Sequence, residues 1–224
     1  MRRNLLVLFT LAIAAGLSGP SLATGDGDYT QAQFALFNTP HLANITEPVT
    51  LTYDFRRSAT EGEGGGFEDL VKMTVTEVGT DGRRNLSFQY LSGERRRPFT
   101  AVEGFRGNPL IMLFLQHDVE GMQKATGGAS VYFRNRIRHA FRRGAEVGES
   151  TVELGGETLG ATRVTIRPFA KDPKLARFPR LAEKWYEFVL APGVPGGLYQ
   201  IRSVVPSASG GEPPIENSLT YAGT

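Results

Sequence analysis

Asn108-Pro109-Leu110-Ile111-Met112-Leu113-Phe114-Leu115 opens the stretch of sequence that decides the fold. Asn108 can accept backbone N–H bonds as a helix cap, and Pro109 suits the first helical position, where no N–H is needed. The run that follows is apolar on all sides, so it predicts a helix whose first turns are buried. Gly127-Gly128 ends this helix, because glycine adopts the left-handed conformation at little cost.

Beyond residue 115 the apolar residues are predicted to occupy only one side of this helix. The residues predicted to face inward are Val119, Met122 and Ala125, and those predicted to face elsewhere are His117, Asp118, Glu120 and Lys124. A second helix follows, for which Ser130 is the predicted cap. Phe133, Ile137, Ala140 and Phe141 form its single apolar stripe. The sequence therefore predicts a helical pair inserted at residues 108–143.

Outside this pair the chain alternates apolar and polar residues, as half-buried strands do. Thr80-Asp81-Gly82 and Gly155-Gly156 are typical of tight turns between paired strands. The predicted strands are 49–55, 70–78, 86–90, 95–102, 151–154, 158–167, 184–190, 198–205 and a short one at 218–221. Such an order implies an antiparallel meander, and a sheet this large curls because strands twist. We predict a mainly β (α+β) fold, a half-barrel or open barrel wrapped around the helical pair.

The N-terminus has the pattern of a signal peptide over residues 1–23. Arg2-Arg3 is the charged region, residues 5–15 are apolar, and Ser21-Leu22-Ala23 is a small-residue cleavage site. The apolar run is too short to span a membrane. We therefore expect a periplasmic or secreted protein, cleaved near Ala23, in which residues 24–224 form a single domain.

Composition excludes several kinds of site. The chain has no cysteine, which removes disulfides, thiol catalysis and most structural zinc sites. It has 25 Lys and Arg against 23 Asp and Glu, and 23 of each once Arg2 and Arg3 are removed, so no global charge attracts nucleic acid. Three histidines lack metal-ligand spacing, and no serine lies in a nucleophile elbow. We predict no metal, no cofactor and no catalytic residue.

His117 and Asp118 are the one adjacent pair that resembles an acid–base couple. Neighbouring residues of a helix point about 100° apart, so these two side chains cannot act on each other. We therefore predict that His117 is structural or faces solvent.

The second helix is rich in arginine, with no acid among its basic residues. These residues are Arg134, Arg136, Arg138, Arg142 and Arg143. One interpretation is a solvated amphipathic helix whose arginines pair with Asp or Glu elsewhere. The other is that Arg134, Arg136 and Arg138 contact anionic phospholipid headgroups or an acidic partner, since the planar guanidinium suits phosphate.

The chain resembles the periplasmic half-barrel carriers of the lipoprotein-localisation family and related envelope proteins. The resemblance lies in the signal peptide, the meander, the helical insertion and the turn Val194-Pro195-Gly196-Gly197-Leu198-Tyr199. It implies a concave apolar surface that holds acyl chains or another apolar ligand. The chain departs from the family in its arginine-rich helical pair and in lacking a cysteine for lipidation.

These observations favour a binding or carrier protein for a lipid or other apolar small molecule. The predicted ligand-lining residues are Leu113, Phe114, Met122, Tyr132 and Phe133, with Arg134, Arg136 and Arg138 near the opening. The alternative is a non-enzymatic envelope scaffold or assembly factor with a filled core and a protein partner. An enzyme ranks last, because no polar constellation of catalytic type is present in the sequence.

Overall fold

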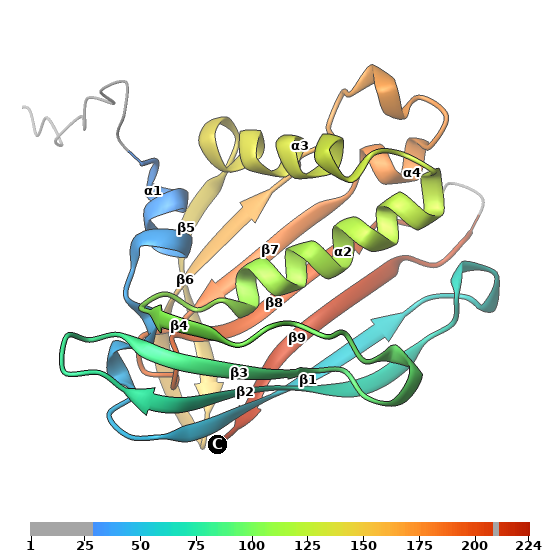
Figure 1. Cartoon of the computed structure of the whole chain (residues 1–224). Helices are drawn as coiled ribbons and strands as arrows, with labels where there is room; N and C mark the ends of the chain where they lie inside the picture. Colours follow the sequence, from blue (N-terminus) through green and yellow to red (C-terminus); the bar gives the residue numbers. More distant parts are fainter. Residues whose placement is uncertain (1–28, 208–210) are drawn as a thin grey trace, which may run out of the picture.

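A computed structural model describes residues 29–207 and 211–224, so the predicted signal peptide and its cleavage site lie outside the described residues (Figure 1). The described chain forms one nine-stranded antiparallel sheet in the order β4-β3-β2-β1-β9-β8-β7-β6-β5. The strands are β1 (Val49–Ser58), β2 (Phe67–Val78), β3 (Arg84–Tyr90), β4 (Val102–Phe105), β5 (Glu146–Leu154), β6 (Glu157–Ile166), β7 (Trp185–Leu190), β8 (Leu198–Val205) and β9 (Ile215–Gly223). The sheet is curved and not closed into a barrel, which confirms the predicted fold class.

The two terminal strands of the chain meet in the middle of the sheet. β1 pairs with β9, with Tyr53 opposite Tyr221 and Ser58 opposite Glu216. The sheet is therefore two meanders, β1–β4 and β5–β9, joined along this central pair. The helical pair connects β4 to β5, which are the two edge strands on opposite sides of the sheet.

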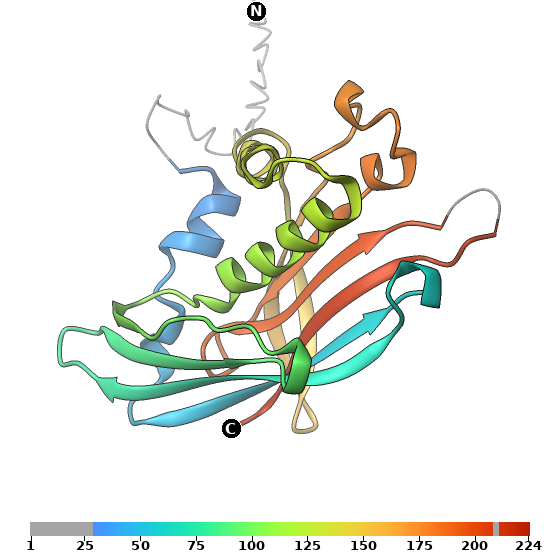
Figure 2. The same cartoon turned by 45° about the vertical axis from the view of Figure 1, so that its right-hand side comes forward.

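The helical pair covers the concave face of the sheet (Figures 1 and 2). α2 spans Leu110–Thr126 and α3 spans Ser130–Arg143, close to the predicted limits. A short helical segment, α1 (Gln31–Gln33) continued by a π-turn at Phe34–Asn38, lies against the end of α3, where Thr30 Oγ1 donates to the carbonyl of Phe141 at 2.9 Å. The remaining helical segments are α4 (Pro179–Ala182) and turns at His41–Asn44, Glu61–Glu63, Gly93–Arg95 and Pro173–Leu175.

Two sequence predictions at element ends are wrong. Ser130 does not cap α3 but is its first residue, because Ala129 is the last residue in an extended conformation. The strand predicted at residues 95–102 is reduced to an isolated bridge between Tyr90 and Arg97, and β4 begins only at Val102. Pro98 explains the interruption, because proline has no N–H to give to a strand ladder.

Asn108 fixes the start of α2. Its Oδ1 accepts the backbone N–H of Leu110 at 3.0 Å, as a capping residue does, and its Nδ2 donates to the carbonyl of Gly196 at 2.9 Å. Gly196 has a φ of +77°, and a Cβ there would lie 2.7 Å from Leu51 Cδ1. Only glycine fits this turn, so the start of α2 is tied to the turn between β7 and β8.

We predict that Asn108→Ala lowers the free energy of unfolding by about 2–3 kcal/mol, because it leaves a buried N–H and a buried carbonyl without partners. Urea denaturation followed by circular dichroism measures the change. Asn135→Ala is the matched control on the exposed side of α3, and it is expected to change stability by less than about 0.5 kcal/mol. Equal effects of the two substitutions would contradict the capping role.

Candidate functional site

A charged residue lies in the middle of the buried stripe of α2. Phe114, Asp118 and Met122 follow one another at a spacing of four, which places them on one side of the helix. Their exposed fractions are 0%, 4% and 5%. The prediction that Asp118 faces elsewhere is wrong, and so is the inward prediction for Ala125, which is exposed.

Donors from the sheet converge on the Asp118 carboxylate. Lys184, just before β7, places its Nζ 2.8 Å from each carboxylate oxygen. The Tyr186 hydroxyl of β7 donates to Oδ2 at 2.5 Å, and Ser203 Oγ of β8 donates to Oδ1 at 2.9 Å. Asn217 Nδ2 of β9 adds a longer contact of 3.3 Å. One carboxylate on α2 thus binds side chains from three neighbouring parts of the sheet.

The protonation states in this cluster follow from its environment. Burial alone would raise the pKa of Asp118, but the charge of Lys184 and the hydrogen bonds from Lys184, Tyr186 and Ser203 outweigh burial and lower this pKa below its usual value. Burial and the Asp118 charge raise the pKa of Tyr186 well above 10. The cluster therefore holds an ionised carboxylate and a neutral phenol at physiological pH.

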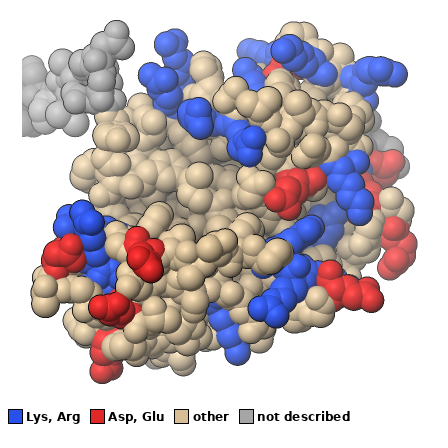
Figure 3. Space-filling view, viewed as in Figure 1, with Lys and Arg blue, Asp and Glu red and all other residues tan. Residues whose placement is uncertain are grey.

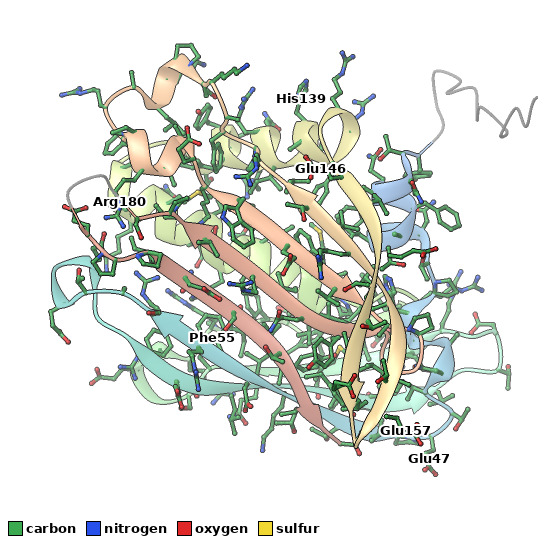
Figure 4. The ribbon with its side chains drawn as sticks, turned by 180° about the vertical axis from the view of Figure 1, so that it is seen from behind. Glu47, Phe55, His139, Glu146, Glu157 and Arg180 are labelled. Carbon is green, nitrogen blue, oxygen red and sulfur yellow. The ribbon has the colours of Figure 1, made fainter. Side chains whose placement is uncertain are left out.

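The cluster continues to the surface at one end of the sheet. Asn217 Oδ1 accepts from Arg57 Nη1 at 3.0 Å, and Arg57 Nη2 donates to the carbonyl of Glu63 at 2.8 Å. Arg180 Nη1 then pairs with Glu63 at 2.6 Å and with Glu212 at 2.7 Å. Figure 4 shows Arg180 at this end, beside the ends of β8 and β9. Polar contacts thus lead from beneath α2 to solvent.

Two further polar groups are buried next to this cluster. The His117 ring packs edge-on against Phe55, with centroids 5.4 Å apart, and lies 5.5 Å from the ring of Tyr90. Among the described residues, His117 Nδ1 and the Tyr90 hydroxyl have no hydrogen-bond partner. Burial lowers the pKa of His117, although the charge of Asp118 opposes the shift, so this ring is neutral at pH 7. Burial raises the pKa of Tyr90 well above 10.

The predicted ligand-lining residues divide between two places. Phe114 and Met122 lie under α2, where Phe114 faces Phe55 with ring centroids 6.3 Å apart. Phe133 packs under α3 against Phe169 at 5.9 Å. Leu113 and Tyr132 are only partly buried. Phe114, Met122 and Phe133 nevertheless belong to one hydrophobic cluster, and Leu113 and Tyr132 pack against it.

Two depressions of the described surface lie beside α3. The larger is about 400 Å³, and its lining residues are Val131, Tyr132, Asn135, Arg136, Asp172 and Lys174. The other is about 260 Å³ and lies between α1 and the end of α3. The interface between α2 and the sheet is filled by the buried side chains of the core.

The arginines of α3 differ in their partners. Arg136 Nε lies 2.9 Å from the Asp172 carboxylate, an ion pair whose N–H is poorly aligned for a hydrogen bond. Arg134, Arg138, Arg142 and Arg143 are exposed, and in the part of the chain that the structure describes no carboxylate lies within 4.0 Å of their guanidinium groups. Ion pairing among the described residues thus accounts for one of these five arginines.

Two other findings concern residues 29–207 and 211–224 as a whole. Within these ranges no three His, Asp or Glu side chains are grouped so that they could hold a metal ion. No helix within them is long and apolar enough to cross a bilayer.

We predict that Asp118→Ala lowers the free energy of unfolding by about 3–5 kcal/mol, because it leaves the buried Lys184 ammonium without its partner. Chemical denaturation at pH 7 measures the loss. Glu120→Ala, on the outer side of the same helix, is the matched control and is expected to cost less than about 0.5 kcal/mol.

The same two proteins test the protonation state of Asp118. Its pKa is lowered by folding, so its contribution is present above the unfolded value of 3.8 and is lost as the pH falls through the folded pKa. The stability difference between wild type and Asp118→Ala should be constant from pH 7 to about 5 and should shrink at lower pH. A difference that grows on acidification would contradict an ionised Asp118.

Comparison with known proteins gives one structural likeness. No protein-family model and no curated protein matches the chain. The chain is similar to the crystal structure of the Mycobacterium tuberculosis lipoprotein LppX, with 10% sequence identity, a TM-score of 0.32, and coverage of 82% of this chain and 90% of that one.

Proposed function

We propose that this protein is a non-enzymatic, periplasmic or secreted binding protein for an apolar ligand such as a lipid or an acyl chain. The ligand would enter between α2 and the concave face of the sheet when α2 moves outward. The observation that carries this proposal is the polar interface around Asp118, in the place where a sealed core would be apolar.

A buried ion pair is a poor way to hold a core closed permanently. Replacing a buried ion pair by apolar side chains of similar volume often leaves the stability of the protein unchanged or raises it by about 1–4 kcal/mol. When the interface opens, however, Asp118 and Lys184 regain water, which offsets part of the free energy of exposing Phe114 and Met122. A helix bound through such a cluster therefore separates from the sheet more readily than one bound through apolar contacts alone.

The groups beneath α2 also indicate the chemistry of the ligand. Opening would uncover aromatic and aliphatic side chains from both surfaces, among them Phe55 and Phe114, which suit a hydrocarbon chain. The unpaired Tyr90 hydroxyl and the His117 Nδ1 are both neutral at pH 7. They suit one uncharged polar group, such as an ester or a hydroxyl, at the end of an otherwise apolar molecule.

A second candidate function is an envelope scaffold or assembly factor. The core side chains packed between α2 and the sheet favour it, because a filled core leaves no preformed space for a ligand. The two functions differ in one respect that can be measured. A carrier takes up an acyl compound and α2 must move, whereas a scaffold does neither.

The first test replaces the polar cluster by apolar residues in the variant Asp118→Leu/Lys184→Met/Tyr186→Phe/Ser203→Ala. We predict that this variant is more stable than wild type by about 1–4 kcal/mol, and that it takes up a fluorescent acyl probe at least about fivefold more weakly, because its closed state is favoured by the same amount. Titration of the probe and urea denaturation give the two quantities.

Glu120→Leu/Lys124→Met is the matched control, because it removes one acidic and one basic residue from the outer side of α2. Its probe uptake should equal that of wild type. Wild-type protein with no probe uptake, and with no lipid in an organic extract analysed by mass spectrometry, would refute the carrier and leave the scaffold. Equal uptake by wild type and the apolar variant would refute a moving α2.

The second test concerns the unpaired hydroxyl of Tyr90. We predict that Tyr90→Phe raises the free energy of unfolding by about 1 kcal/mol, because it removes a buried polar atom without a partner. The same substitution should weaken binding of an acyl ester probe, because the ligand loses a donor. Tyr186→Phe is the control buried tyrosine, and it should destabilise the protein, since its hydroxyl binds Asp118. Destabilisation by Tyr90→Phe would show that this hydroxyl is already satisfied.

A further inference from the structure

The outward side of α3 is a continuous basic stripe. Its exposed residues follow the helical spacing of three and four, and they are Val131, Arg134, Asn135, Arg138, His139 and Arg142, with Arg143 beside them. No acid interrupts the stripe. Figure 4 shows His139 at the outer edge of the molecule on this helix. Because the structure gives these arginines no carboxylate partner among residues 29–207 and 211–224, ion pairing within those ranges does not account for the row.

A second segment adds cations to the same edge of the molecule. The connection between β6 and β7 contains the exposed residues Lys171, Lys174 and Arg177. Figures 1 and 2 show this connection rising beside α3, and Figure 3 shows Lys and Arg side chains gathered along this edge. We call Arg134, Arg138, Arg142, Arg143, Lys171, Lys174 and Arg177 together the basic edge.

Specific contacts hold the two segments of the basic edge together. Asp172 accepts the Tyr132 hydroxyl at 2.7 Å and pairs with Arg136 at 2.9 Å. The Lys174 ammonium lies 5.6 Å from the centre of the Tyr132 ring. The Asp172 side chain is only 6% exposed, so its charge interacts with these internal groups and not with solvent. The cations around it thus remain available to an external anion.

Apolar side chains accompany the cations. Val131 is 54% exposed at the start of α3 and lines the depression that Lys174 also borders, and Phe178 is 37% exposed just before α4 in the β6–β7 connection. A helix that combines a basic face with exposed apolar residues can lie in the plane of a bilayer surface. Arginine also binds phosphate oxygens through its planar fork, which favours phospholipid headgroups.

We infer that the basic edge docks the protein on an anionic phospholipid bilayer, with Arg134, Arg138 and Arg142 at the centre of the contact. Seven cations on one edge are within the range that binds anionic lipid surfaces. They come from one helix and the connection beside it (Figure 2). This surface is separate from the ligand site proposed under α2 and does not depend on it.

The test measures co-sedimentation of the full chain with phosphatidylcholine vesicles that contain or lack phosphatidylglycerol, in 0.1 M salt. Wild type should bind only the anionic vesicles and should be released at 0.5 M salt, where screening is stronger. Arg134→Gln/Arg138→Gln/Arg142→Gln should bind about a hundredfold more weakly, at about fivefold for each cation removed. Lys171→Gln/Lys174→Gln/Arg177→Gln should show a loss of similar size.

Arg56→Gln/Arg96→Gln/Arg106→Gln is the matched control, because it removes three exposed arginines from other parts of the surface. It should bind anionic vesicles as wild type does. Glutamine is a good helix former, and a thermal melt by circular dichroism verifies that each variant is folded. Binding that is absent in wild type, or that falls equally in the control, would overturn the inference.

Soluble polyglutamate provides the competing class of partner. If it binds the basic edge as tightly as anionic vesicles do, the surface belongs to an acidic protein and the membrane inference fails. Acyl-probe uptake in the absence of vesicles should be the same in all of these variants. Failure of membrane docking and failure of the proposed ligand binding are thus observed in separate measurements.

Discussion

The Asp118 carboxylate determines where α2 crosses the sheet. It receives donors from the start of β7, from β7 itself and from β8, with Asn217 of β9 at longer distance. Apolar contacts alone would allow the helix several positions, because they are not directional. The hydrogen bonds to one buried charge allow only one, since any sliding of α2 would leave a charged group unsolvated. The cluster therefore adds specificity of position to a core whose stability comes from its apolar side chains.

α2 is consequently attached in two different ways along its length. Its start is fixed by the neutral hydrogen bonds of Asn108 to the turn at Gly196, and its middle is fixed by the charges around Asp118. Water can stabilise the separated charges but gives less to the apolar turns near Leu110. If the two attachments differ in this manner, the Asn108 end is the pivot and the end at Gly127 moves furthest. α3 and its basic edge follow directly after that end.

Local patterns predicted most of the elements. The spacing of apolar residues gave both helices, alternation gave eight strands, and glycine pairs marked the turn at Gly155 and the end of α2 at Gly127. The pairing of β1 with β9 was not predictable in this way, because each strand pattern fits any antiparallel neighbour. Asp118 was missed because a charged residue usually faces water, although its spacing of four from Phe114 and Met122 was visible in the sequence. The partner of Arg136 is distant in sequence, so no local pattern could reveal it.

The central position of β1 and β9 has a consequence for how the chain reaches this structure. β1 pairs on one side with β2, which follows it closely, but its other neighbour is residues 215–223. Until those residues have been synthesised, β1 is an exposed edge strand, and the two meanders cannot join through the pairing of β1 with β9. Pairing across so long a stretch of chain is slow, because the entropy of loop closure is lost before any contact stabilises the pair. Nascent chains should therefore stay incompletely folded until residues 215–223 have been made, and until then the open edge of β1 is exposed to aggregation.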